Sequence, residues 1–263
     1  MHTHLLRCFG ARAGAGNPAL VVDGGDLDPA ARGALARARA TTCVFLDAPA
    51  DADDGAWTVD FYYPHTRSPL CLHATLAAAA VLFERLPDAG PRAVRTAMKG
   101  QLLALERAGD DYLVRLTAHP VDVPDVDAHA AAALLGVPDE ALASAPRVAS
   151  IGSPKLLVEV AGSTRLYDLS PDLARIAAWG KAHGVNGIYA WCRHGDGTFE
   201  GRNFNHIDPA LEDPATGVAA GALTALLGRG LDLRQGRATG HDCLIRTRVD
   251  GADILVGGAV EKV

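Results

Sequence analysis

The chain has 263 residues, a formal net charge of −6 at pH 7 and 49% hydrophobic residues, so it can form one large domain or two of ordinary size. Its pI near 5.9 and the lack of any run of lysine and arginine argue against nucleic acid or an anionic membrane as the main partner. The first residues include no apolar stretch long enough for a signal peptide, and no segment approaches the ~18 apolar residues of a membrane span. We therefore expect a cytoplasmic protein that binds a small molecule.

The first half of the chain is predicted to alternate strands and helices. A Gly-x-Pro turn leads into an apolar strand at residues 16–23, and Asp28 followed by Pro29 is typical of a helix start. Strands are expected at 43–49 and 57–64, and a short loop then leads into the segment SPLCLHATLAAAAVLFERLP.

This last segment predicts a helix that is apolar on every side. From Ala74 to Phe83 the only polar side chain is Thr75, whereas a surface helix would keep a polar face for water. Other structure must therefore enclose this helix, and Cys71 and His73 stand at its start.

The second half of the chain repeats this order of elements, which indicates an internal duplication. Asp213 follows Cys71 by 213 − 71 = 142 residues, and each stands just before an alanine-rich helix. The other matching segments are a strand at 152–160 after a second Gly-x-Pro turn, a helix opened by Ser170 and Pro171, and strands at 187–193 and 199–204.

The duplication predicts an α/β (α+β) fold of two pseudo-symmetric lobes, residues 1–120 and 121–263, each a curved mixed sheet around a central apolar helix. Residues 120–147, rich in Pro and Asp around a short helix, form the expected connector, and Asp250-Gly251 predicts a hairpin turn near the end. A cleft is expected between the lobes. If both helix starts face it, their free N–H groups and positive dipole ends would hold a substrate carboxylate.

Three side chains at the helix starts are candidates for acid–base chemistry. A helix N-terminus lowers the pKa of a thiol and disfavours a protonated imidazole, so Cys71 and a neutral His73 are suited to proton transfer near neutral pH. Asp213 has the same place in the second half. The alternatives are structural: His73 and Asp213 as capping residues, and Cys71 as a small buried hydrophobe.

Other site types find little support. His65, His206 and His241 lie near segments that should reach the cleft, but their spacing from His73 is too long to predict a metal site, so we expect no metal. The early GARAGAG has neither the lysine of a P-loop nor the context of a dinucleotide fingerprint, and no serine forms a nucleophile elbow. No cofactor is expected.

The residues resemble those of a known family, the PhzF-like isomerases of phenazine biosynthesis, relatives of diaminopimelate epimerase and proline racemase. The likeness covers nearly the whole chain and is carried by GNPALVV, PLCLHATLAAAAVL, GSPKLLV, GRNF and EDPATGVAAGAL. It implies two similar α/β lobes with the active site between them, often in a homodimer. It also implies that His73 and Asp213 shift a proton in a cyclic hydroxylated diene amino acid, together with a glutamate. In the epimerase branch paired cysteines act as bases, and Cys71 matches the first of them.

The chain departs from the family pattern around the expected pocket. Thr42 stands where the family has its catalytic glutamate, and a threonine cannot act as a base near neutral pH. Leu72 and Val218 replace a glycine and a polar residue at the two helix starts. His206 and His241 replace a proline and an arginine, and are candidates to supply the missing proton-transfer group. Clustered changes of this kind favour an altered substrate or reaction over an inactive enzyme.

The preferred function is therefore a cofactor-independent isomerase of secondary metabolism that shifts a proton and a double bond in a small carboxylate-bearing substrate. Asp213 and His73 would act as the acid–base pair and Cys71 as a reserve base. An epimerase, racemase, lyase or cyclase using the same cleft, and a non-catalytic binding protein, remain alternatives. The expected substrate-binding residues are Asn17, Thr42, Leu72, Ala74, Thr75, His206, Gly217, Val218 and His241.

Overall fold

The computed structural model describes residues 1–49, 55–86, 92–122, 125–205 and 212–263. The chain forms two compact units, one of residues 1–116 with 257–263 and the other of residues 117–256. The sequence predicted a division after residue 120; these units divide four residues earlier, and the last seven residues are counted with the first unit. The end of the chain joins unit 1 because Leu6 and Lys262 are partners in an antiparallel strand pair.

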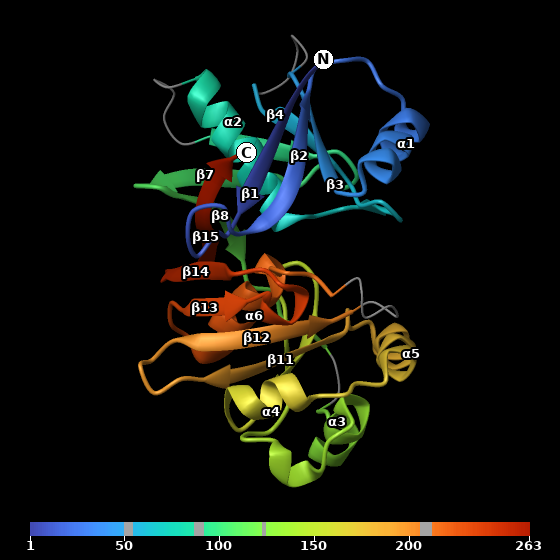
Figure 1. Ribbon diagram of the computed structural model, residues 1–263, viewed down its shortest axis with the longest axis vertical. Helices are drawn as coiled ribbons and strands as arrows, with labels where there is room; N and C mark the ends of the chain where they lie inside the picture. Colours follow the sequence, from blue (N-terminus) through green and yellow to red (C-terminus); the bar gives the residue numbers. More distant parts are fainter. Residues whose placement is uncertain (50–54, 87–91, 123–124, 206–211) are drawn as a thin grey trace. The chain divides into compact units, whose positions relative to one another are not determined.

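Unit 1 is a mixed sheet with two helices (Figure 1). The strands follow the order β1-β2-β3-β4-β6-β7-β8, and the end of β15 pairs with β1. The short β5 pairs with β4. The strands are β1 (His2–Cys8), β2 (Asn17–Asp23), β3 (Thr42–Asp47), β4 (Trp57–Tyr62), β5 (Arg67–Ser68), β6 (Arg92–Thr96), β7 (Leu102–Ala108), β8 (Asp111–Thr117) and β15 (Asp253–Lys262); the helices are α1 (Pro29–Arg39) and α2 (Leu72–Arg85).

The central strands of unit 1 are buried on both faces, which explains their nearly continuous apolar sequences. Leu20, Val22 and Phe45 pack in one core cluster with Ala36 of α1. The alternate residues of β2 and β3 face the other way, toward α2, which packs on β1 to β4. All residues of α2 from Leu72 to Leu82 are buried. The prediction of an enclosed, apolar helix is confirmed.

Unit 2 repeats the connectivity of unit 1, which confirms the predicted fold class. In both units an antiparallel pair (β1–β2, β9–β10) is followed by a parallel, an antiparallel, a parallel and an antiparallel pairing. The strands are β9 (Arg147–Ala149), β10 (Lys155–Glu159), β11 (Ile188–Arg193), β12 (Phe199–Phe204), β13 (Asp232–Gln235) and β14 (Cys243–Asp250); the helices are α3 (Ala128–Leu135), η1 (Asp139–Ala141), α4 (Gly162–Asp168), α5 (Leu173–His183), α6 (Gly217–Leu227) and η3 (Arg237–Thr239).

The apolar helix α6 occupies the same place in unit 2 as α2 does in unit 1. In unit 1, α2 comes after β4 and the short β5; in unit 2, α6 comes after β12 and packs on β9, β10 and β14. Its Gly221 allows a close approach, because an added Cβ would lie 2.0 Å from Cδ1 of Ile151 and 2.9 Å from Cγ2 of Val256. The opposite face of the sheet, with Leu156 and Ile188, packs on α3, α4 and α5.

Two local predictions are corrected and others are confirmed. The expected connector is part of unit 2, since Leu135 of its helix α3 belongs to the core of that unit. The helix expected to open at Ser170 opens at Asp172, whose carboxylate accepts a hydrogen bond of 3.0 Å from the backbone N–H of Arg175. The cap at Asp28 is confirmed, as are β14 and β15 as hydrogen-bonded neighbours on either side of Asp250-Gly251. No helix in the described part of the chain is long and apolar enough to cross a membrane.

Candidate active site

Cys71 and His73 form a buried pair at the start of α2. Cys71 is the N-cap residue and makes no side-chain cap hydrogen bond. Its Sγ lies 3.4 Å from Nδ1 of His73 and accepts a hydrogen bond of 3.3 Å from the hydroxyl of Tyr63. Both Cys71 and His73 are 3% exposed. The structure thus brings the two candidate groups of unit 1 into contact.

The first turn of α2 offers backbone donors rather than side-chain donors. The N–H groups of residues 72–74 lack an acceptor within the helix by its geometry. The hydroxyl of Thr75 donates to the carbonyl oxygen of Cys71 at 2.8 Å, and is therefore used inside the helix. Leu72 and Ala74 are buried and apolar, so any polar contact they make to a ligand must come from their backbone.

Thr42 and Asn17 lie on the face of the sheet that carries α2. Thr42 pairs with Ala19, and Asn17 stands two residues before Ala19 on the same strand, so all three share one face. Thr42 is 8% and Asn17 5% exposed. Thr42 therefore occupies a buried polar position without offering a carboxylate, as the sequence indicated.

Asp213 lies in a turn before α6 and is not its capping residue. The N-cap is Thr216, which makes no side-chain cap hydrogen bond. One oxygen of Asp213 accepts from the hydroxyl of Thr216 at 3.0 Å, and the other from the N–H of Ala215 at 3.4 Å. The alternative that Asp213 is an ordinary N-cap is therefore wrong. Its half-buried carboxylate is held beside the helix start without blocking it.

Gln235 of β13 fixes this turn to the sheet. Its Nε2 donates to the carbonyl oxygen of Asp213 at 2.7 Å, and its Oε1 accepts from the N–H of Thr216 at 3.2 Å. The same Oε1 accepts from the hydroxyl of Tyr189 at 3.0 Å. Neither Gln235 nor Tyr189 was singled out from the sequence, because their role depends on strand pairing that no local pattern reveals.

The other expected residues of unit 2 lie around the same turn. A Cβ at Gly236 would lie 2.9 Å from the carbonyl oxygen of Pro214 and 3.1 Å from Cβ of His241, which places His241 beside the turn. Nδ1 of His241 lies 2.9 Å from the carbonyl oxygen of Thr239. Gly217 is buried and Val218 half-buried in the first turn of α6. His206 lies outside the described residues.

Unit 2 also contains a buried lysine, Lys155, that was not among the candidate residues predicted from the sequence. Lys155 of β10 is 0% exposed, and its Nζ donates to the carbonyl oxygen of Asn186 at 2.5 Å. Burial lowers the pKa of Lys155 to about 7, although the nearby charge of Asp213 opposes the shift. The available signal was a single lysine inside the apolar strand sequence GSPKLLVEV.

Other buried acids near Asp213 remain protonated at neutral pH. Burial and the charge of Asp213 raise the pKa of the Cys243 thiol to about 12. Burial is also the main reason that the pKa of Tyr189 lies well above its ordinary value. Neither group supplies a base near pH 7.

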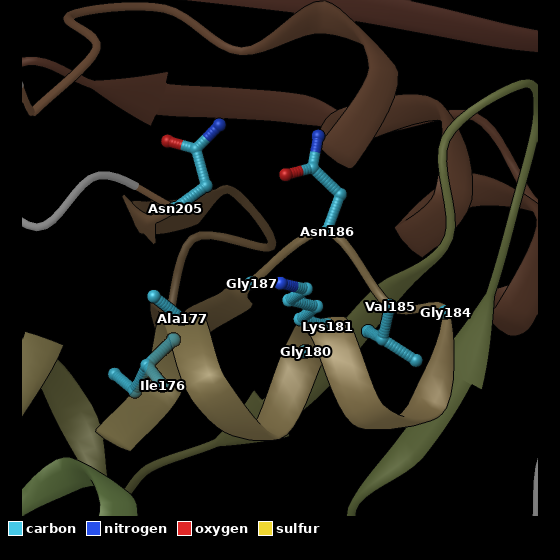
Figure 2. A pocket seen from close by; sticks show the side chains of 9 residues that line it. All are labelled: Ile176, Ala177, Gly180, Lys181, Gly184, Val185, Asn186, Gly187 and Asn205. Atoms are coloured by element: carbon cyan, nitrogen blue, oxygen red, sulfur yellow. The ribbon is translucent and has the colours of Figure 1, made fainter. Parts of the chain in front are cut away.

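A separate hollow of about 320 Å³ lies beside α5 in unit 2 (Figure 2). Its lining includes Lys181, Asn186 and Asn205, together with glycines at the end of the helix. None of the expected site residues lines it. Asn186 is the link to the site, since its carbonyl oxygen accepts the hydrogen bond from Lys155.

One group of side chains in the described residues has a composition suited to a metal ion. Ligand atoms of Cys192 in β11, His194 just after β11 and Glu200 in β12 lie within 4.8 Å of one another. The carboxylate of Glu200 already accepts hydrogen bonds from the hydroxyl of Tyr167 at 2.8 Å and from the guanidinium of Arg237 at 3.3 Å. That positive charge disfavours a cation, so we assign no metal to this group.

Comparisons with known proteins identify the family of the chain. The model of the PhzC-PhzF family, described as phenazine biosynthesis-like protein, matches residues 6–260. The uncharacterized isomerase YddE of Escherichia coli K12 is 30% identical over 217 residues, which cover 75% of this chain and 73% of the relative. An uncharacterized isomerase of Deinococcus radiodurans is 31% identical over 252 residues, with 89% and 79% covered.

Solved structures extend the likeness to the fold. A predicted epimerase of Pseudomonas aeruginosa superposes with a TM-score of 0.80 at 26% identity, covering 99% of this chain and 96% of the other. A hydroxyproline epimerase of Agrobacterium vitis superposes with a TM-score of 0.58 at 13% identity, covering 99% and 90%; this second likeness is one of fold. The chain is an enzyme of the isomerase type, and it belongs to the PhzC-PhzF family of phenazine biosynthesis-like proteins.

Proposed function

We propose that the enzyme shifts a proton, and with it a double bond, in a small carboxylate-bearing substrate, with His73 and Asp213 as the acid–base pair. The observation that carries this proposal is the equivalence of the two helix starts. Each unit buries one apolar helix at the same place in the same strand order, and the N-cap of neither helix makes a side-chain cap hydrogen bond. Each start holds a proton-transfer group beside free N–H donors.

The chemistry follows from these groups. Backbone N–H groups and the positive end of a helix dipole stabilise a substrate carboxylate and the negative charge that develops when a neighbouring C–H bond is broken. Asp213 accepts that proton as its carboxylate and the electron pair moves along the conjugated system. His73, protonated to the imidazolium for this step, donates a proton to the distal carbon and becomes neutral; transfer of the proton from Asp213 to solvent and of one from solvent to His73 resets the pair. No cofactor is needed in this scheme. Thr42 takes no part as a base, because its hydroxyl does not ionise near neutral pH.

The location of the protein and its assembly belong to the same proposal. We place the reaction in the cytoplasm and in secondary metabolism, and we propose that the enzyme is a homodimer, as the family resemblance implies. Size-exclusion chromatography with light scattering tests the dimer directly. A monomer at micromolar concentration would contradict it.

A second candidate reaction is epimerisation between Cys71 and Asp213. The observation in its favour is the contact of 3.4 Å between Sγ of Cys71 and Nδ1 of His73, which lets the imidazole take the thiol proton. The hydroxyproline epimerase of similar fold was solved with bound trans-4-hydroxy-L-proline, so this amino acid is a suitable probe. Cys71→Ala should abolish epimerisation and leave a proton shift by His73 and Asp213 measurable.

Deuterium exchange distinguishes the two reactions. The enzyme is incubated in D₂O with trans-4-hydroxy-L-proline, L-proline or a cyclic hydroxylated diene amino acid, and label is located by NMR. Label at the distal carbon of the diene supports the isomerase, and label at the stereocentre supports the epimerase. Binding of a probe without exchange of any proton would support the non-catalytic alternative.

Variants assign the exchange to the proposed pair. Asp213→Asn and His73→Ala should each reduce exchange by about 10²–10⁴, and the double variant should lose little more than either single one if both serve one substrate. Asp232→Asn and His183→Ala change exposed residues of unit 2 and are the matched controls. Unchanged exchange in Asp213→Asn would refute the proposal.

A further inference from the structure

Lys155 is an unusual residue in the core of unit 2. Its side chain is fully buried, yet within the described residues only one of the three N–H donors of an ammonium group has a partner, the carbonyl oxygen of Asn186 at 2.5 Å. A buried ammonium normally has a carboxylate within hydrogen-bond distance. Among the described residues, the charge that interacts with Lys155 is that of Asp213.

The sheet geometry places Lys155 on the face that carries the Asp213 turn. Leu156 and Val158 of β10 face the α3–α5 core, so Lys155 and Leu157 face the α6 side. Tyr189 of β11 faces the same side, because its hydroxyl reaches Gln235. Asn203 stands directly opposite Tyr189 in the strand pair, is 1% exposed, and has no hydrogen-bond partner for either polar atom of its amide in the described part of the chain.

This face of the sheet therefore carries buried hydrogen-bonding groups that lack partners among the described residues, close to the turn of the proposed base. Among the residues that the structure describes, two donors of Lys155 and the amide of Asn203 are buried without partners, a costly arrangement in a completed core. Such groups are retained where a ligand or a charge in the site makes use of them. The carboxylate of the adjacent Asp213 turn accepts a hydrogen bond from the hydroxyl of Thr216, and its charge interacts with Lys155.

We propose that Lys155 is a positioning residue for Asp213, its buried ammonium being the counter-charge that holds the carboxylate ready to accept the substrate proton. This inference rests on the proposed function and names a residue that the family resemblance did not supply. When Asp213 accepts one proton from the substrate carbon, the net charge of the Lys155–Asp213 pair rises from zero to +1. If Lys155 is already deprotonated before this step, the carboxylate of Asp213 has lost its counter-charge.

The pair should therefore lose activity as the pH rises through the titration of Lys155. The pKa of this buried amine is lowered to about 7, so the loss falls near neutrality. Tyr189 and Cys243, which face the Asp213 turn from β11 and β14, have raised pKa values and do not titrate there.

The remaining charged groups around the turn are carboxylates and one histidine. Asp242 adjoins Cys243, and Glu212 precedes Asp213 and forms an ion pair with Arg202 at 2.9 Å. His241 beside the turn is the group that a pH profile must separate from Lys155. The variant His241→Gln separates the two groups. The loss of activity at alkaline pH, called here the alkaline limb of the pH profile, should persist in this variant.

The first test observes Lys155 itself and requires no turnover. The protein has four lysines, at positions 99, 155, 181 and 262, so labelling with ¹³Cε-lysine gives few NMR signals, of which Lys155 is the one missing in Lys155→Met. We expect Asp213→Asn to lower the titration midpoint of Lys155, because the attraction that favours its charged form is lost. Asp232→Asn should leave it unchanged. An identical midpoint in wild type and Asp213→Asn would overturn the proposal.

The second test uses the D₂O exchange assay with the diene amino acid. Lys155→Met should lower exchange at saturating probe about tenfold or more with little change in KM, since the ammonium acts through Asp213. Lys155→Arg keeps its charge at high pH and should shift the alkaline limb upward. An unshifted limb with full activity in Lys155→Met would also overturn the proposal.

The two tests separate failure of this inference from failure of the proposed function. If wild type exchanges no proton with any probe while Lys155 still responds to Asp213→Asn, the pairing stands and the reaction is wrong. If exchange depends on Asp213 but Lys155 does not respond, the reaction stands and the positioning role is wrong. Should either Lys155 variant fail to fold, the comparison of wild type with Asp213→Asn still decides.

Discussion

Nε2 of Gln235 donates a hydrogen bond of 2.7 Å to the backbone carbonyl oxygen of Asp213. The main chain of the proposed base is thus fixed by Gln235, while its carboxylate oxygens accept hydrogen bonds from Thr216 and Ala215. The same amide accepts hydrogen bonds from Thr216 and Tyr189 through Oε1, so one buried side chain joins the turn, the helix start and the sheet.

Gln235→Leu should destabilise unit 2 and displace Asp213. It leaves three buried polar groups without a partner, and at about 1–3 kcal/mol for an unsatisfied group the free energy of unfolding should fall by ~3 kcal/mol. Chemical denaturation monitored by circular dichroism measures this fall. Gln101→Leu in unit 1 is the matched control, because Gln101 is only half-buried. A similar fall in both variants would show that the bonds of Gln235 carry no special weight.

Gly201→Ala should disturb the same network through Tyr189. A Cβ at Gly201 would lie 2.2 Å from the hydroxyl oxygen of Tyr189, whose fully buried ring has no room to retreat. We expect a loss of about 1–3 kcal/mol from overpacking, together with loss of the Tyr189–Gln235 hydrogen bond. Gly195→Ala has open space around it and should change the thermal midpoint little. Equal midpoints for the two variants would contradict the model of a crowded face.

Stability should depend on pH through Lys155. Burial lowers its pKa from 10.5 to about 7, so between these values the unfolded chain binds more protons than the folded one, and the free energy of unfolding rises with pH. The contribution of a shift of this size is on the order of 5 kcal/mol. Above pH 10.5 the burial of Lys155 has no such effect on the free energy of unfolding, because the amine is neutral in both states. Below about pH 7 the full destabilisation applies.

At higher pH, the buried cysteines make the free energy of unfolding fall as the pH rises, opposite to the effect of Lys155. Burial raises the pKa of Cys43 to about 11 and of Cys243 to about 12, so the stability they contribute is present below pH 9 and declines above it. The rise due to Lys155 should therefore be clearest between pH 7 and 9. Urea denaturation of wild type and Lys155→Met across this range isolates it, and parallel curves would refute the assignment.

Asp60 should be essential for the stability of the segment that leads to Cys71. Its carboxylate, 4% exposed, pairs with Arg32 at 3.2 Å and with Arg67 of β5 at 2.8 Å. Asp60→Asn leaves Arg67 without its ion pair, and we expect a loss of about 2–3 kcal/mol, less than for a fully buried pair because Arg67 is partly exposed. Glu106→Gln, which breaks a more exposed pair with Arg115, should cost under about 1 kcal/mol. Similar losses would count against a special role for Asp60.

Much of the fold followed from local signals in the sequence. The apolar run after Cys71 predicted a buried helix because no side of it could face water, and the matching order of turns, strands and helices predicted two units of one design. Helix starts were less certain. Ser170 and Asp172 are both good capping residues, and only the formed helix shows that Asp172 accepts the N–H of Arg175.

The sequence by itself determined the class of fold and the residue types at the two helix starts, because hydrophobic pattern, capping and turn chemistry act over a few residues. The family resemblance added that Thr42 stands where a glutamate is expected. Only the tertiary structure decided that Lys155, Tyr189 and Gln235 surround the Asp213 turn, since these residues come from three strands up to 80 positions apart (235 − 155). Strand pairing brings them to one buried face, and burial there gives a single lysine its altered chemistry.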